Sequence, residues 1–166
     1  MARRSESMEF ETSEGACEIT VTQLDGNRGG TLGIRLAQLV GPSIVNLVGA
    51  MEGNDMKKVV EAAQTLIGKV TPEEFERIKG EVLRGAQAKF NGEFVDVNAN
   101  FIGEAFAGHP GSLYKLIGFA LKVNFQSFFS DLGMNAERIQ GAVRNAMALK
   151  TSPGSKQPAS SGQSGD

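Results

Sequence analysis

The chain has 166 residues and a net charge of −2, with 40% hydrophobic and 22% charged residues. This length fits one domain with a tail, and the composition is that of a globular protein. The slightly acidic balance argues against a protein that neutralises nucleic-acid phosphates, and no apolar run reaches the ~20 residues of a membrane span. No apolar segment follows Arg3-Arg4, so the N-terminus does not resemble a secretory signal. The lone Cys17 allows no intramolecular disulfide and favours a reducing compartment.

The first predicted element is a short β-hairpin over residues 7–24, preceded by a flexible segment of residues 1–6. Glu14-Gly15 provides a turn, and the second arm alternates with Cys17, Ile19 and Val21 on one face. Because an isolated hairpin is marginally stable, this face must rest on helices or on another copy of the chain. Residues 25–30 (DGNRGG) are interpreted as a flexible loop, since they lack the spacing and the Lys-Ser/Thr pair of a phosphate-binding loop.

Residues 31–89 have a helical period. Thr31 is the expected N-cap of the first helix, and the sequence Thr71-Pro72-Glu73-Glu74 predicts a capping box at the start of a later one. Asn91-Gly92 favours a tight β-turn between Phe90 and Phe94, the alternative being a plain loop. The apolar faces expected in the first and the later helix comprise Leu32, Leu36, Leu39, Val40, Phe75, Ile78, Val82 and Ala86.

An aromatic-rich helical region spans residues 98–131. Eight of the ten Phe and the single Tyr fall between Phe90 and Phe129. A helix over residues 112–131 is apolar around most of its circumference, which predicts that it is buried on most sides as a core helix. The alternative is a helix partly buried against another copy or a partner, with Tyr114, Phe125 and Phe129 in the contact.

A last amphipathic helix is expected over residues 134–150, followed by a disordered Ser/Gly/Pro-rich tail of residues 151–166. The apolar stripe of this helix comprises Ile139, Val143 and Met147. In one interpretation the stripe contacts a partner or a sister subunit, and in the other it closes the core. The predicted fold class is therefore mainly α-helical (α+β). It comprises the short N-terminal β-hairpin, a bundle of about five to six helices and the tail.

The sequence offers no constellation for catalysis. His109 is the single histidine, so no paired-histidine metal site exists, and its Gly/Pro-rich surroundings indicate an exposed turn. Cys17 is expected to be a small buried residue of a strand. The carboxylates of Glu73, Glu74 and Glu76 are accounted for by a helix N-terminus. We therefore expect no enzyme, no cofactor and no metal.

Residues 106–129 (FAGHPGSLYKLIGFALKVNFQSFF) resemble the closing motif of phage tail assembly chaperones. The front end agrees, with an alternating strand (ITVTQL) and a helix that ends in Leu-Val-Gly-Pro at residues 39–42. The residues that carry the motif are Phe106, Gly108, Leu113, Leu116, Phe119, Ala120, Leu121, Val123, Asn124, Phe125, Phe128 and Phe129.

The resemblance implies a helical assembly factor that binds the tape-measure protein and helps recruit tail tube subunits. It also implies action in the host cell cytoplasm and absence from the mature virion. A homo-oligomer is expected as well, and the charge and the short apolar runs leave no nucleic-acid or membrane partner expected. A long amphipathic tape-measure rod would aggregate unless an apolar surface covers it. The alternatives are a structural virion or connector protein and a generic helical oligomeric adaptor.

Overall fold

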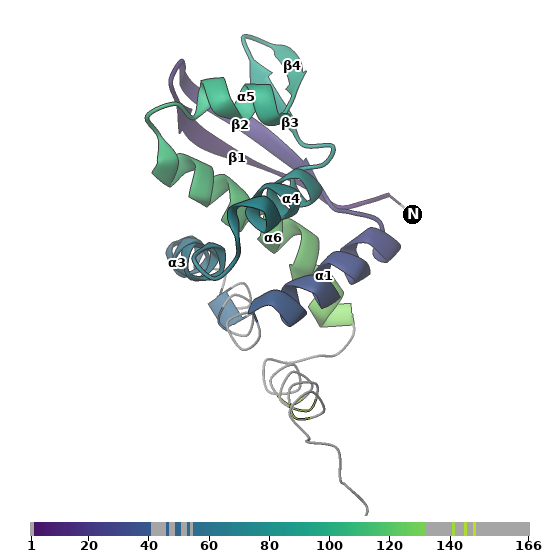
Figure 1. The fold of residues 1–166 in the computed structure, drawn as a ribbon. Coiled ribbons are helices and arrows are strands. Elements are labelled where there is room, and N and C mark those ends of the chain that lie inside the picture. Colours follow the sequence, from purple (N-terminus) through teal and green to yellow (C-terminus); the bar gives the residue numbers. More distant parts are fainter. Residues whose placement is uncertain are drawn as a thin grey trace, which may run out of the picture.

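The computed structural model describes residues 2–40 and 55–131, together with residues 46, 49, 50, 53, 141, 145 and 148. The predicted helix over 134–150 and the tail over 151–166 thus lie almost entirely outside the described residues. Figure 1 shows the arrangement of the elements. In chain order they are β1 (Ser5–Thr12), β2 (Gly15–Thr22), α1 (Gly26–Val40), α3 (Met56–Ile67), α4 (Pro72–Val82), β3 (Gln87–Phe90), β4 (Glu93–Asp96), α5 (Ala99–Ala105) and α6 (Pro110–Asp131).

The four strands form one antiparallel sheet in the order β1-β2-β3-β4. The predicted bundle of five to six helices behind a lone N-terminal hairpin is therefore wrong, because a second hairpin extends the first through the pair Ile19↔Ala88. The strand β3 lies at the end of the range 31–89 that periodicity assigned to helices. The hairpin interpretation of Asn91-Gly92 is confirmed: both residues have positive φ (47° and 88°), as a two-residue type I′ turn requires.

The first hairpin has one apolar and one polar face. Cys17, Ile19 and Val21 are buried, as their alternation predicted, and Phe10 of β1 is buried with them. On the opposite face the hydroxyls of Ser7 and Thr20 hydrogen-bond across the strands at 2.7 Å, and those of Ser5 and Thr22 at 3.0 Å. A slip of one residue would exchange the two faces, so burial fixes the register.

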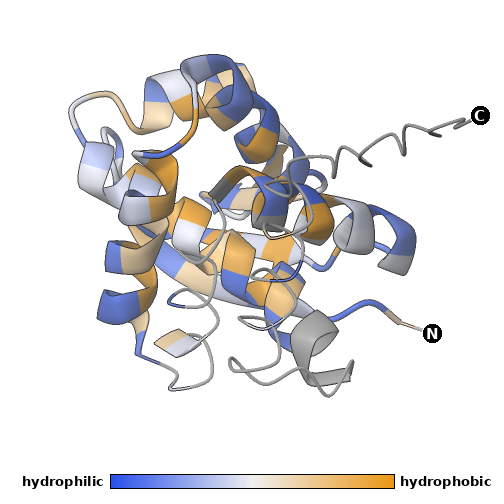
Figure 2. Cartoon of the chain, turned by 60° about the horizontal axis from the view of Figure 1, so that its bottom comes forward, coloured by the Kyte–Doolittle hydropathy of each residue, from blue (hydrophilic) through white to orange (hydrophobic). Residues whose placement is uncertain are grey.

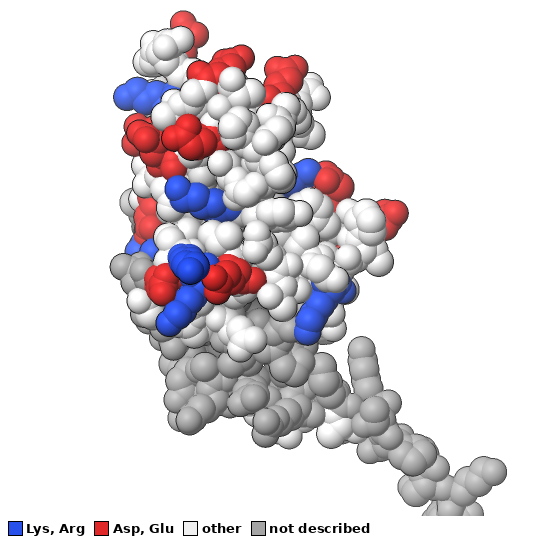
Figure 3. All heavy atoms as spheres, turned by 90° about the vertical axis from the view of Figure 1, so that its left-hand side faces the viewer, with Lys and Arg blue, Asp and Glu red and all other residues white. Residues whose placement is uncertain are grey.

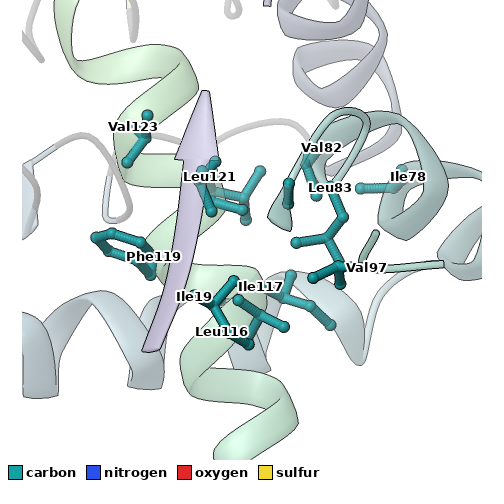
Figure 4. Close-up of a cluster of buried hydrophobic side chains, with 14 of the residues drawn as sticks. Ile19, Ile78, Val82, Leu83, Val97, Leu116, Ile117, Phe119, Leu121 and Val123 are labelled. Carbon is teal, nitrogen blue, oxygen red and sulfur yellow. The ribbon is translucent and has the colours of Figure 1, made fainter. Parts of the chain in front are cut away.

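The helix α6 lies against the apolar face of the sheet and also contacts α1, α3 and α4. Residues 116–121 and 123–125 are buried, which confirms the interpretation of a core helix. In Figure 4, Leu116 and Ile117 of α6 lie beside Ile19 of β2, with Val82 and Leu83 in the same cluster. Figure 2 shows hydrophobic positions concentrated where the elements meet in the interior.

Gly118 allows α3 to approach α6 closely. A Cβ added at Gly118 would be in ordinary van der Waals contact with Val59 Cγ1 at 3.4 Å and Ala63 Cβ at 3.6 Å. Alanine would therefore fit, whereas a side chain that extends beyond Cβ would push α3 away. Gly85, which periodicity placed inside a helix, instead follows the end of α4 with a φ of +76°. Its left-handed conformation is one that glycine adopts without steric cost.

The helix α1 begins at Gly26 rather than at Thr31, so most of the predicted loop 25–30 is helical. Asp25 acts as the cap: its Oδ1 accepts a hydrogen bond of 3.0 Å from the backbone N–H of Arg28. This hydrogen bond lowers the pKa of the Asp25 carboxyl. The hydroxyl of Thr31 donates to the carbonyl of Asn27 inside the helix, at 2.8 Å.

The predicted start of α4 is confirmed. Thr71 caps the helix by accepting a 3.3 Å hydrogen bond from the N–H of Glu74, and Pro72 is its first residue. The Glu74 carboxylate, however, binds Arg35 of α1 at 2.9 Å and thereby joins the two helices. Asp55 caps α3 and Asn98 caps α5 in the same way as Thr71 caps α4.

Candidate functional site: interaction surfaces

The two residues weighed as catalysts are not placed for catalysis. Cys17 is buried in β2, and this burial raises the pKa of its thiol, which disfavours the nucleophilic thiolate. His109 is exposed before α6, where its carbonyl accepts the N–H of Ser112 at 3.1 Å. Within the described part of the chain, no group of three or more His, Cys, Asp or Glu side chains is placed to hold a metal ion. None of the helices described here has the length and apolarity to cross a bilayer.

The predicted partner-binding residues fall into different environments. Phe125 is 1% exposed in the core, and Tyr114 is half-buried near the start of α6. The side chain of Phe129 and the stripe Ile139, Val143 and Met147 lie outside the described residues. The partner-binding role of all six therefore stays a prediction.

Asn124 is the polar residue inside the predicted closing motif, and its role is structural. Its side chain is buried, with a residue exposure of 2%. It accepts a hydrogen bond from the N–H of Leu24 at 2.8 Å and donates to the carbonyls of Val82 and Ala120 at 3.1 and 2.7 Å. The amide thus ties α6 to the segment after β2 and to the end of α4.

Large apolar side chains are exposed at two places on the described surface. Ile34 (60% exposed) and Leu39 (39%) lie on α1, although periodicity had placed Leu39 on the buried face. Phe94 (63%) and Val95 lie on β4, whose other edge pairs with no described strand. The Lys89 ammonium lies 5.8 Å from the centre of the Phe94 ring. Sequence reasoning missed the β4 pair because alternation over four residues is too short a signal.

A groove of about 400 Å³ lies between α1 and α4. Four arginines that are widely separated in the sequence line it, above a floor that includes Leu32 and Ile78, both buried. We call it the arginine groove. Only the packing of α1 against α4 brings these side chains together, so no sequence motif reveals them. Its full lining comprises Asn27, Arg28, Thr31, Leu32, Arg35, Arg77, Ile78, Glu81 and Arg84.

The first hairpin carries the opposite charge. Residues 5–22 contain five glutamates and no lysine or arginine. Figure 3 shows one face of the molecule, on which acidic side chains gather over the sheet end. We call the four exposed glutamates of this hairpin the acidic hairpin face: Glu9, Glu11, Glu14 and Glu18.

The family model described as "Phage tail assembly chaperone protein, TAC" matches residues 15–136. Comparisons with curated proteins and with solved structures returned no match. The matched range runs from β2 through the whole of α6 and includes the complete motif at 106–129. Membership implies a non-enzymatic role in tail assembly inside the infected cell, with tail proteins as partners. The chain belongs to the phage tail assembly chaperone family.

Proposed function

We propose that this chaperone binds the tape-measure protein as a homo-oligomer in the host cell cytoplasm. It then helps recruit tail tube subunits and is released before the virion is complete. The observation that carries this proposal is the family match over residues 15–136. The alternative is a structural protein retained in the particle.

To cover the tape-measure protein and later release it, the chaperone needs an exposed apolar surface that binds it with modest affinity. The apolar side chains of α6 between residues 116 and 125 are used inside the domain, so they do not cover a rod in this conformation. The exposed Ile34 and Leu39 on α1, together with the sequence-predicted stripe at 139, 143 and 147, supply small patches. Small patches bind weakly one at a time, and many copies along a rod multiply their effect while leaving release possible.

The binding test is capture of co-expressed tape-measure protein by the tagged full-length chaperone. Replacing Ile139, Val143 and Met147 together by Ser is expected to abolish capture while leaving far-UV helicity and thermal unfolding largely unchanged. A matched control, Phe94→Ser with Val95→Ser, removes exposed apolar surface at the far edge of the sheet and is expected to retain capture. Loss of folding in the triple variant would instead assign the stripe to the core.

Release is tested by mass spectrometry of purified virions, with this chain quantified against the tape-measure and tube proteins. We expect the chain in lysates of infected cells and not in particles. A fixed stoichiometric amount in particles would establish the structural alternative and overturn the chaperone cycle proposed above.

A further inference from the structure

We propose that the arginine groove of one copy binds the acidic hairpin face of a second copy, so that molecules associate head to tail. This inference names the interface through which copies of the chain would associate. It rests only on the homo-oligomer in the proposed function. It makes no use of the tape-measure site.

The groove retains unused hydrogen-bonding capacity. Arg35 pairs with Glu74 and Arg84 with Glu81, each through one nitrogen at 2.9 Å. A guanidinium has five N–H donors in a fork that fits a carboxylate, so these arginines can bind further acids. No ion pair is recorded for Arg77 with any described residue. Arg28 also pairs with Asp25, at 3.6 Å, so three of the four arginines have a carboxylate partner and Arg77 supplies the excess positive charge of the groove.

The groove also has an apolar floor formed by Leu32 and Ile78. Such a floor accommodates the hydrocarbon part of a protein side chain beneath the charged rim. The five glutamates of the hairpin would repel the phosphates of a nucleic acid. The chemistry of the groove therefore favours a protein segment bearing carboxylates.

The acidic hairpin face has such carboxylates in a close row. Glu9 and Glu18 are directly opposite each other in the β1–β2 pairing, and Glu11 lies on the same face two residues further along β1. Like charges directly opposite each other across a sheet are destabilising in an isolated domain. Lys89 of β3 is directly opposite Glu18 on its other side and offsets part of this repulsion. Glu9 and Glu11 form no ion pair with any described residue, so a cationic surface from outside would offset the rest.

The two surfaces cannot meet within one molecule. Glu9, Glu11 and Glu18 alternate with the buried residues of β1 and β2, so they lie on the sheet face opposite to the one that packs on α6. The groove lies between α1 and α4. Contact between two different surfaces is heterologous and repeats from copy to copy, giving a ring or an open chain. Exposed ion pairs are weak and screened by salt, so the association is expected to be reversible and to fall with ionic strength.

The test uses charge reversal on each surface of the purified full-length chain. One variant is Arg77→Glu with Arg84→Glu, and the other is Glu9→Lys with Glu18→Lys. Sedimentation velocity at low salt is expected to show association of the wild type, and each variant alone should bind itself at least tenfold more weakly. An equimolar mixture should recover association, because the retained acidic face of the first variant fits the retained groove of the second. The two reversed surfaces are again of opposite charge and can form the alternate junction.

The matched control is Lys57→Glu with Lys58→Glu, a reversal at two exposed lysines of α3 away from both surfaces, which should associate as the wild type does. Thermal unfolding checks that each variant is folded. A wild type that stays monomeric at low salt, or a mixture that fails to recover, overturns the proposal. If the wild type stays monomeric, an acidic segment of another protein becomes the remaining candidate to bind the groove. Tape-measure capture is read separately, so failure there bears on the proposed function and not on this interface.

Discussion

Asn124 joins three segments that lie far apart in the sequence. Its amide satisfies the N–H of Leu24 and the carbonyl of Val82, which are 100 and 42 residues away. Leaving a buried donor or acceptor unpaired costs about 1–3 kcal/mol per group. This asparagine is therefore a polar residue whose position inside an apolar motif is explained by the backbone groups around it.

We expect Asn124→Ala to lower the free energy of unfolding by about 3 kcal/mol, because it leaves these two backbone groups without their partner. Asn98→Ala is the matched control. It removes the same side chain from an exposed N-cap of α5, where the expected loss is about 1 kcal/mol. Urea unfolding of both variants measures the difference. Equal losses at the two positions would show that the buried network contributes nothing beyond a cap.

Asn124→Asp tests the direction of the same hydrogen bonds. The new carboxylate can still accept from Leu24 but would face the carbonyl oxygens of Val82 and Ala120, to which the native amide donates. Burial and these oxygens both raise the pKa of the introduced carboxyl. A folded-state pKa above the unfolded value gives stability that is present below the unfolded pKa and is lost as pH rises through the folded pKa.

The stability deficit of Asn124→Asp relative to the wild type should thus be smaller near pH 4 than at pH 7. Urea midpoints measured for both proteins across this range provide the readout. A deficit that does not change with pH would mean that the introduced carboxyl is not held against these carbonyls.

At the scale of elements, two glycines of the α4 region differ in whether the backbone requires glycine. Gly80 lies in the helix interior with open space around an added Cβ, whereas Gly85 has a φ of +76° just after the helix. Gly80→Ala should stabilise the fold by about 0.5–1 kcal/mol, since alanine has the higher helix propensity. Gly85→Ala should destabilise it by about 1–2 kcal/mol through left-handed backbone strain.

Thermal unfolding of the two alanine variants is the measurement, and opposite shifts of the melting temperature are the expected result. Two shifts of the same sign would contradict the conformations assigned here to one glycine or the other.

Short sequence signals correctly predicted the element boundaries that are set by a cap or by a tight turn. Thr71-Pro72 marks the start of α4, and Asn91-Gly92 marks the turn of the second hairpin, because caps and type I′ turns are set by neighbouring residues. The addition of β3 to β2 escaped prediction, since strand pairing across 69 residues, from Ile19 to Ala88, leaves no periodic trace. The arginine groove escaped for the same reason.

The whole molecule depends on a strand outside the range that the family model matches. That match begins at residue 15, yet β1 (Ser5–Thr12) pairs with β2 along its full length. Phe10 of β1 is buried, and its ring centre lies 5.9 Å from that of Phe119 in α6. Because α6 also contacts α1, α3 and α4, a cavity left by removing the Phe10 ring would weaken the packing of the shared core.

Phe10→Ala should therefore lower the free energy of unfolding by about 3–5 kcal/mol, as expected when a buried phenylalanine is truncated. Phe94→Ala is the matched control: the same change at an exposed position of the same sheet should cost less than about 0.5 kcal/mol. Urea unfolding followed by far-UV circular dichroism measures both. A small cost for Phe10→Ala would make β1 an appendage of the domain, whereas the expected large cost makes the first strand part of the core on which α6 and every surface proposed here depend.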